Sequence, residues 1–526
     1  MATVVPRHQT KFQKISNAEK HLVPAFQAHA TLGHKEWFLL PIQPSAPTNA
    51  FSSAPKTIYY DLEPNDCKQI DNLIIRLNVS ASGGDVQLVG APYLFSEITL
   101  RSDKGSGNRL FRCLPEMIIA WIMLTMNDES QQQWAKLMNY AIPDIQSKNQ
   151  KKYWYNESNY IRNGESRYIY IPLPLNFIQF SALDLRHIKN PLRFIFETSS
   201  DVVITGSSSN LSLDGIDFIV AGHNEAEFDQ HAAVAMAKKA SHAFNFLTAD
   251  LLTVNDKTLT ASTKSEFYLD NFVGKSPFLM ICIKGSTTPQ ASDGTLFDFY
   301  EIGKNGTVTM ENTSGRDLLS QGNPITQEQM YIHVTDQLGR RPYQGMHLVC
   351  FTEDIRQAVA GKIAGFFQFN GERHKLAITF DSAPTQEVHQ VSIGTTSGSG
   401  DYRYAFENIG LSDQDVDYDE AVADIATIIN AMPCLKDIGL SVSSVSANIQ
   451  TATTQNITYS ARSGRVSDEL GKITMLDAPV KVNSTSVTTY GDDGWTTGSN
   501  YEVNIFCYKY CRFIVDKEGN LEVEEL

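Results

Sequence analysis

The chain has 526 residues, of which 42% are hydrophobic and 20% are charged, a balance typical of soluble globular proteins. At about 100–200 residues per domain, this length predicts three or four structural units. The net charge of −15 disfavours a surface that wraps nucleic acid, because phosphate binding requires clustered Lys and Arg side chains.

Residues 1–55 are polar and slightly basic, and we expect them to form an N-terminal arm ahead of the first folded core. Up to residue 36 only Glu19 and Glu36 oppose five basic side chains, which are Arg7, Lys11, Lys14, Lys20 and Lys35. The segment lacks the apolar centre of a signal peptide, so we expect synthesis in a cytoplasm. Proline and serine residues at its end indicate a linker.

Residues 56–240 carry mostly strand signals, with apolar side chains on alternate positions. The predicted strands cover 71–80, 93–102, 166–175, 190–199 and 211–220. Between the second and third of them, residues 114–126 and 131–141 have apolar side chains at helical spacing. We expect this region to form a first β-sandwich of the jelly-roll type.

Residues 241–388 repeat this order, which indicates an internal duplication. Predicted strands at 276–285, 296–312, 345–354 and 372–381 surround a short helical stretch at 326–336. The aromatic-rich run at 501–516 then predicts one long closing strand. We therefore expect a second jelly roll that is built from residues 241–388 and 491–526.

Residues 389–490 interrupt the second jelly roll and are rich in Ser, Thr, Gly and Asp. Residues 417–435 predict one amphipathic helix, whose apolar stripe consists of Val422, Ile425, Ile428 and Ile429. Strand candidates follow at 439–447 and 456–461. The expected fold is thus dominated by β-structure: two tandem jelly-roll β-sandwiches with short helices and a small inserted α+β domain.

Three stretches resemble the double jelly-roll major capsid proteins of tailless icosahedral DNA viruses, which often contain a membrane. LVCFTEDIRQAVAGKIAGFFQFNGERHKLAITF (348–380) is similar to the late strand pair of the family's second roll. YEVNIFCYKYCRFIVDKEGNLEVEEL (501–526) resembles its closing strand and tail, and APYLFSEITLRS (91–102) resembles a strand of its first roll. The resemblance covers about 57–388 and 491–526. The 389–490 segment departs from it and looks like small modules that decorate phage structural proteins.

The resemblance implies a major capsid protein of a virion that is assembled in the host cell, with pseudo-hexagonal homotrimers tiling an icosahedral shell. The implied partners are further copies, neighbouring capsomers, and penton and minor capsid proteins. The arm would reach an internal membrane or the genome, and the sequence does not identify a host receptor. The alternative is a viral spike or a carbohydrate- or receptor-binding β-sandwich protein, because jelly rolls serve both roles.

No motif in the sequence predicts an enzyme, so we assign no catalytic, cofactor-binding or metal-binding residue and expect no cofactor. The sequence holds no glycine-rich phosphate loop, GxSxG, HExxH or paired CxxC motif. Seven widely spaced cysteines predict no disulfide framework, and buried thiols are expected at Cys507 and Cys511. His8, His21, His29 and His34 fit no metal spacing, and the stripe containing Trp121 is interpreted as packing.

One acidic run leaves two interpretations open. Asp413, Asp415, Asp417 and Asp419 alternate like the start of a calcium loop, but Tyr418 stands where such a loop needs glycine. The same carboxylates could instead cap the helix predicted at 417–435, because negative charge is favourable at a helix N-terminus.

Overall fold

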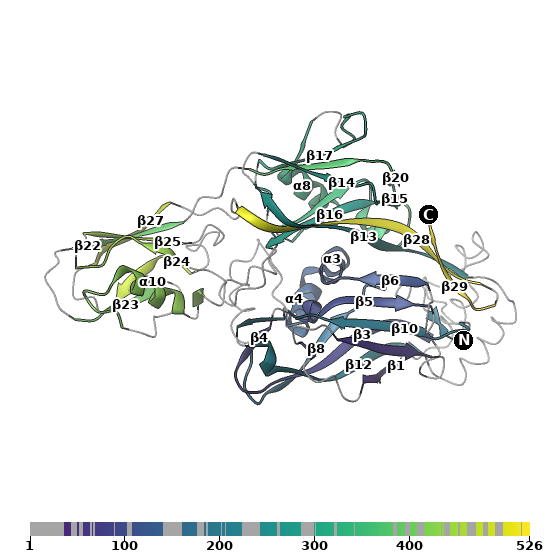
Figure 1. Cartoon of the computed structure of the whole chain (residues 1–526), viewed down its shortest axis with the longest axis horizontal. Coiled ribbons are helices and arrows are strands. Elements are labelled where there is room, and N and C mark those ends of the chain that lie inside the picture. The colour runs from purple at the N-terminus through teal and green to yellow at the C-terminus, as the bar shows by residue number, and fades with distance from the viewer. Residues whose placement is uncertain are drawn as a thin grey trace, which may run out of the picture.

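The computed structural model describes residues 36–526 with gaps, of which the longest are 140–159, 224–241, 286–298, 460–469 and 490–497. Two β-sandwiches and a smaller third unit make up the described chain (Figure 1). In the first sandwich, sheet A has the strand order β1-β12-β3-β8 (Glu36–Gln43, Leu211–His223, Gln69–Ala81, Ser166–Pro172). Sheet B has the order β2-β10-β5-β6 (Thr57–Leu62, Leu192–Thr198, Phe95–Arg101, Arg109–Cys113).

The second sandwich repeats this topology strand for strand. Sheet C has the order β13-β28-β16-β19 (His242–Leu259, Gly498–Val515, Phe278–Gly285, Met346–Cys350). Sheet D has the order β14-β21-β17-β18 (Lys264–Tyr268, Lys375–Thr379, Thr307–Glu311, Ile325–Thr326). In both sandwiches the first, eighth, third and sixth of these strands form one sheet, and the second, seventh, fourth and fifth form the other. This arrangement of eight strands is a jelly roll.

A helix follows the fifth strand of each jelly roll. The first roll has α3 (Pro115–Thr125) and then α4 (Asp128–Leu137), and the second has α8 (Gln327–Leu338). A capping box at Thr326 and Gln329 fixes the start of α8, and Gly339, with φ of 71°, ends it in the left-handed conformation that favours glycine. Helix α9 (Ile355–Val359) follows β19.

Short elements complete both rolls. The first has the 3₁₀ turns Ala91–Leu94 and Ser208–Asn210 and a small sheet of β11, β4 and β7 (Val203–Thr205, Val86–Leu88, Tyr160–Ile161). β9 (Leu183–Asp184) pairs with β3. In the second roll, β15 pairs with β20 (Val273–Ser276, Phe367–Asn370), and β29 (Leu521–Glu525) pairs with β28.

Alternating side chains explain why these segments are strands. In β10, Leu192, Phe194 and Phe196 are buried, whereas Arg193 is only partly buried on the other face. The ring of Phe194 lies 4.9 Å from that of Phe218 on the facing sheet, nearly edge to face. Such contacts form the interior between sheets A and B, and a separate buried cluster fills the space between sheets C and D.

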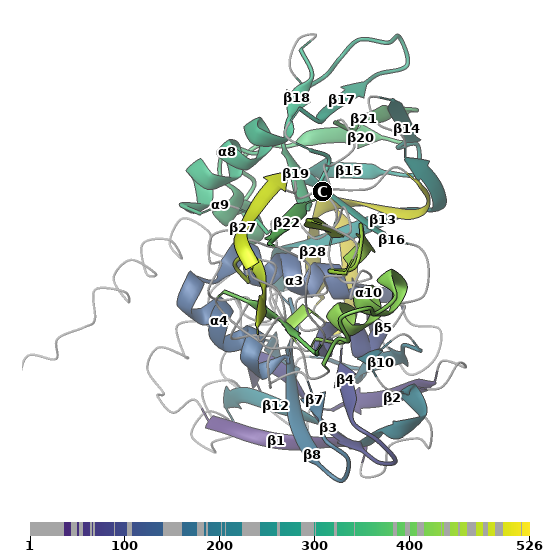
Figure 2. The ribbon, with the colours of Figure 1, turned by 90° about the vertical axis from the view of Figure 1, so that its left-hand side faces the viewer.

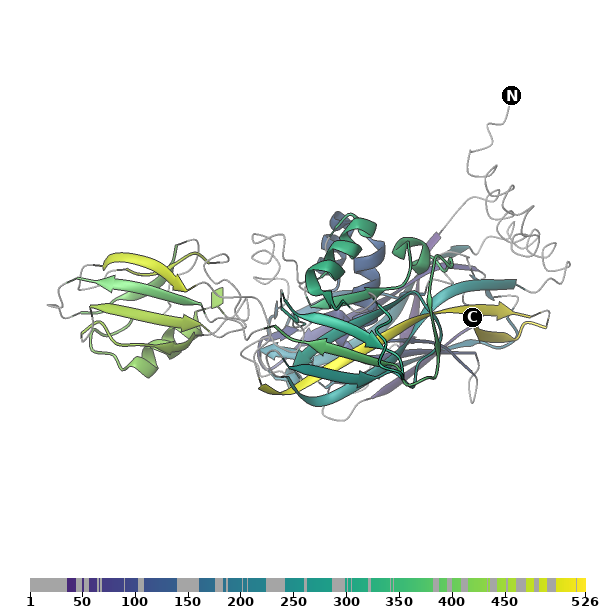
Figure 3. The same ribbon diagram turned by 90° about the horizontal axis from the view of Figure 1, so that it is seen from above.

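The four sheets form a stack in the order A, B, C, D (Figures 1 and 2). Helix α3 lies between sheets B and C, where the two rolls meet. The outer face of sheet A therefore ends the stack on one side, and sheet D ends it on the other. Among the described residues of the two rolls, helices α3, α4, α8 and α9 lie on one side of the stack (Figure 3).

A third unit lies between β21 and β28, the seventh and eighth strands of the second roll. Its sheet has the order β24-β25-β22-β27 (Val442–Val445, Thr454–Tyr459, Val388–Ile393, Val482–Thr489), and β23 pairs with β26 (Arg403–Phe406, Ile473–Leu476). Helix α10 (Val422–Ala431) packs on it and buries Ile425 and Ile429. The unit stands away from the rolls at one end of their strands, opposite β29 (Figures 1 and 3).

The expected fold class is confirmed, and three expectations need correction. Residues 36–43 form strand β1 of sheet A, so this part of the expected N-terminal arm belongs to the first roll. Residues 1–35 lie outside the described residues. The helix expected at 417–435 covers only Val422–Ala431 as α10. The inserted unit also includes Glu387, whose carboxylate bonds to His389, although its start was expected at 389.

Candidate assembly interfaces

The junction between the two rolls is a continuous apolar interior. Phe278, Met280 and Phe506, which point away from the interior of the second roll, are fully buried, and they belong to the same cluster as the first roll's core. A small recess remains between the rolls, lined by Phe111, Met117 and Trp121 of the first roll and by Leu247, Val359 and Tyr508 of the second, among others. Burial of this kind is typical of a permanent contact.

One buried ion cluster crosses the junction. Lys284 Nζ on β16 lies 3.0 Å from Glu116 Oε1 on α3 and 3.0 Å from Glu502 Oε1 on β28. Burial acts to lower the pKa of Lys284, but the negative charges of Glu116 and Glu502 outweigh it and raise this pKa above its usual value. The lysine is therefore charged under physiological conditions and links the two rolls.

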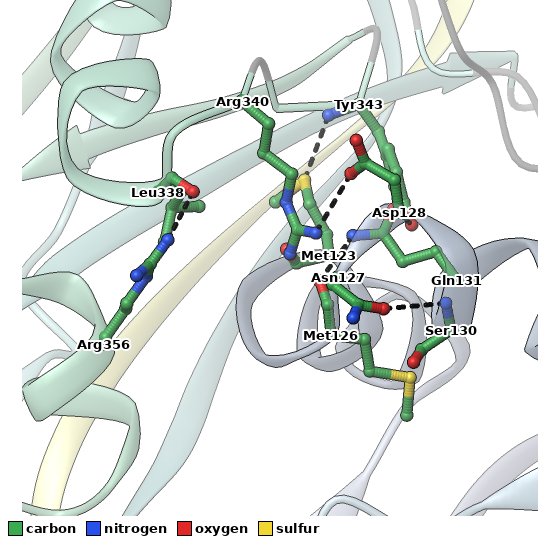
Figure 4. A network of polar contacts seen from close by, with 10 residues as sticks. All are labelled: Met123, Met126, Asn127, Asp128, Ser130, Gln131, Leu338, Arg340, Tyr343 and Arg356. Carbon is green, nitrogen blue, oxygen red and sulfur yellow. Dashed lines mark hydrogen bonds and ion pairs between the residues drawn. The ribbon is translucent and has the colours of Figure 1, made fainter.

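A polar clasp joins the rolls beside α3 and α4 (Figure 4). Arg340, between α8 and β19, donates to the Met123 carbonyl and forms an ion pair with Asp128 at 3.3 Å. The Tyr343 hydroxyl donates to Gln131 Oε1, and Gln131 Nε2 in turn donates to the Met126 carbonyl at 2.9 Å. These contacts fix the helical side of the second roll against the first.

The outer face of sheet A has exposed aromatic and apolar side chains. Trp37 is 57% exposed, Leu39 48% and Tyr168 51%. On the same face, Arg76 on β3 forms an ion pair with Asp217 on β12 at 2.6 Å, and its guanidinium lies 4.6 Å from the centre of the Tyr168 ring. On the helical side of the second roll, Ile332 on α8 is 66% exposed. Sheet A and helix α8 therefore both present apolar groups to solvent.

Of the two interpretations of the acidic run, the structure contradicts the helix cap. Asp413 lies outside the described residues, and Asp415 forms an ion pair with Arg403. A side-chain hydrogen bond to Asp417 is the main reason why the pKa of Asp401 is raised. The expected cap is wrong, because α10 begins after Ala421 and has no side-chain cap. Within the described part of the chain, no three metal-binding side chains gather at one place.

The remaining residues singled out in the sequence are structural or undescribed. Cys507 is buried in the second roll and Cys511 in the cluster at the junction, and burial raises the pKa of each thiol to about 12. Trp121 packs in the recess between the rolls, as expected for a packing stripe. His8, His21, His29 and His34 lie outside the described residues. No described helix is long and apolar enough to cross a membrane.

Comparison with known proteins gives matches by structure. No protein-family model and no curated protein matches the sequence. A chain of the quasi-atomic model of the PBCV-1 virus capsid matches with a TM-score of 0.51 and 12% identity, over 93% of this chain and 97% of that chain. PBCV-1 VP54, in a crystal structure fitted into a cryo-EM reconstruction of the virophage Sputnik, matches with a TM-score of 0.50 and 12% identity, over the same shares. At the level of the fold, the resemblance seen in the sequence is confirmed.

Proposed function

We propose that this chain is a major capsid protein that builds the shell of an icosahedral virion, and that it is not an enzyme. The observation that carries the proposal is the shared double jelly-roll fold, which matches a virus capsid chain over 93% of this chain. The buried junction between the two rolls supports a structural role, because its ion cluster and polar clasp join the two rolls into one building block.

The capsomer we propose is a homotrimer. Two similar rolls in one chain give six rolls in three chains, so that a threefold particle has a nearly sixfold outline and can tile a shell. Closed rings of identical subunits are usual among homo-oligomers. The exposed apolar groups on sheet A and on α8 supply surfaces for such contacts.

We expect the purified chain to scatter light as a particle of about three times 58.6 kDa at micromolar concentration. Electron micrographs of the same sample should show pseudo-hexagonal outlines. A persistent monomer would contradict the capsid proposal, and elongated fibres would favour the alternative, a viral spike or another binding protein.

We also propose that the inserted unit is an outward decoration. It has its own buried cluster and lies at one end of the rolls, opposite the C-terminal strand β29 (Figure 1). Independent interiors of this kind are typical of modules inserted in surface loops.

Replacing residues 386–491 by a short Gly/Ser linker should leave the mass of the particle at three chains, each shortened by the deletion. The expected result follows because the rolls keep their own interiors when the unit is removed. Light scattering provides the measurement, and circular dichroism checks the folding of the rolls. Loss of the trimer in a well-folded sample would assign the unit to the interface.

The proposed partners in the shell are neighbouring capsomers, together with penton and minor capsid proteins. For residues 1–35 we propose contact with an internal membrane or the genome. The support for this contact is the excess of basic over acidic side chains there, because both surfaces attract positive charge.

A further inference from the structure

We propose that the outer face of sheet A in one copy binds helix α8 of a second copy, with Glu328 placed against the Arg76–Asp217 ion pair. This inference rests on the proposed function and assigns residues to the contact between subunits. It follows from the duplication, because the same two faces already meet once inside the chain.

The contact inside the chain defines which faces are involved. The outer face of sheet C covers α3, the helix that follows the fifth strand of the first roll. Sheet A is the counterpart of sheet C, and α8 is the counterpart of α3, because strands and helices occur in the same order in both rolls. Sheet A ends the stack on the side of the first roll, whereas α8 flanks the second roll, so their contact requires a second copy (Figure 2).

The two helices present matching faces. Met117, Trp121 and Leu124 on α3 line the recess against the second roll, and they are the third, seventh and tenth residues of that helix. The third, seventh and tenth residues of α8 are all exposed, and they are Gln329, His333 and Asp336. The face of α8 that corresponds to the buried face of α3 is therefore accessible.

The charges match in the same way. Glu116, the second residue of α3, contacts Lys284, which pairs across strands with Glu502. The corresponding strands of sheet A, β3 and β12, also carry an outward pair of opposite charge, Arg76 with Asp217. The second residue of α8 is again a glutamate, Glu328, and it is exposed. A carboxylate supplied by α8 would thus complete a second cluster of one basic and two acidic groups.

The sheet A face also offers apolar surface for the helix. Leu39, Ile219, Ile74 and Pro172 are directly paired across β1, β12, β3 and β8, so they form one apolar row. Ile74 and Pro172 are buried, and the accessible part of the row is Leu39, which is exposed, with the partly buried Ile219 beside it. Ile332 on α8 is the exposed apolar group that can pack on this row. Polar groups surround it on the helix, as expected where subunits must stay soluble before they assemble.

This contact joins unlike faces, so a finite particle built from it is a closed ring. Each copy uses sheet A toward one neighbour and α8 toward the other, and three copies close a ring of six rolls. A contact between unlike faces generates either a closed ring or an open filament. The proposed trimer is the closed case.

Charge reversal tests the contact. Glu328→Arg and Arg76→Glu should each raise the concentration at which half the chains are trimeric by about tenfold or more, because like charges then meet in the interface. The double variant Glu328→Arg/Arg76→Glu should recover much of the loss. Light scattering over a dilution series provides the measurement.

Arg193→Glu is the matched control for loss of fold. Arg193 forms a similar cross-strand pair with Asp61 on sheet B, and its side chain is 22% exposed, the same as that of Arg76. It should leave the trimer intact. Trimers that resist both single reversals would overturn the interface and leave the capsid proposal standing, whereas a wild-type monomer would overturn both.

Cross-linking gives an independent result that does not depend on charge. Leu39→Cys and Ile332→Cys chains, coexpressed and treated with a bismaleimide reagent, should yield linked dimers on a denaturing gel. Each variant alone should show only the wild-type background. Dimers formed by Leu39→Cys alone would indicate a contact between like faces and would contradict the proposal.

Discussion

Lys284→Met should lower the free energy of unfolding by roughly 3–5 kcal/mol, because it leaves Glu116 buried without its cation. The Glu116 side chain is only 5% exposed, and its pair with Lys284 spans the junction between the rolls. Urea denaturation at one fixed protein concentration provides the measurement, since assembly also contributes to apparent stability.

Two further variants distinguish the loss of the buried ion cluster from the loss of a lysine that contacts two glutamates at the surface. Lys375 also contacts two glutamates, Glu266 at 3.0 Å and Glu311 at 2.8 Å, but on the solvent face of sheet D. Lys375→Met should change stability far less, because water already screens this group. Replacing the whole cluster by Lys284→Met/Glu116→Gln/Glu502→Gln should recover most of the loss, since no buried charge remains. A single variant as stable as the wild type would contradict a structural role for the cluster.

The sign of the pKa shift sets the pH dependence of this effect. The pKa of Lys284 is raised above its ordinary value of 10.5, so its contribution is fully present below pH 10.5. It is lost only as the pH rises through the raised pKa of the folded state. Titration of Lys284 should therefore cause no change in the stability of the wild type between about pH 6 and pH 9.

The sequence predicts those strands in which each face has the same environment from end to end. The runs at 71–80, 190–199 and 211–220 alternate cleanly and appear as β3, β10 and β12. β13 was not predicted, although it has 18 residues. Its side chains contact the junction at Phe246 and the second roll's interior at Leu252, so no single alternation describes it.

Edge position explains why β1 was also missed. β1 contains Pro41 and pairs only with β12 among the strands of its sheet, and proline is tolerated at such an edge. Its outward residues Trp37 and Leu39 are exposed, which removes the usual polar-and-apolar alternation. In the sequence, the segment therefore resembles the linker that follows it.

The candidate interfaces could not be predicted from the sequence, because they join residues that are far apart along the chain. Glu116 and Lys284 are 168 positions apart, and nothing near either residue indicates its partner. The duplication itself could be predicted from the sequence, because it depends on the order of strands and helices. Only the stacking of the sheets identifies which faces of that duplication are already covered and which remain free.

His389→Leu should destabilise the inserted unit by roughly 3–5 kcal/mol while leaving the two rolls unchanged. His389 Nε2 lies 2.7 Å from Glu387 Oε1, and both side chains are about 1% exposed. Nδ1 accepts a hydrogen bond from the Ile473 backbone N–H at 3.2 Å, which assigns the ring proton to Nε2. Removing the ring takes the donor from a buried carboxylate and the acceptor from a buried backbone group.

Calorimetry distinguishes this local loss from a global one. Because the unit has its own interior, it should melt in a transition separate from that of the rolls, and only that transition should move to lower temperature. The double variant His389→Leu/Glu387→Leu should recover part of the loss, because no carboxylate then remains in the apolar interior. A shift of both transitions together would mean that the unit and the rolls unfold as one body. The unit would then not be a separable decoration, and the deletion of residues 386–491 should fail for the same reason.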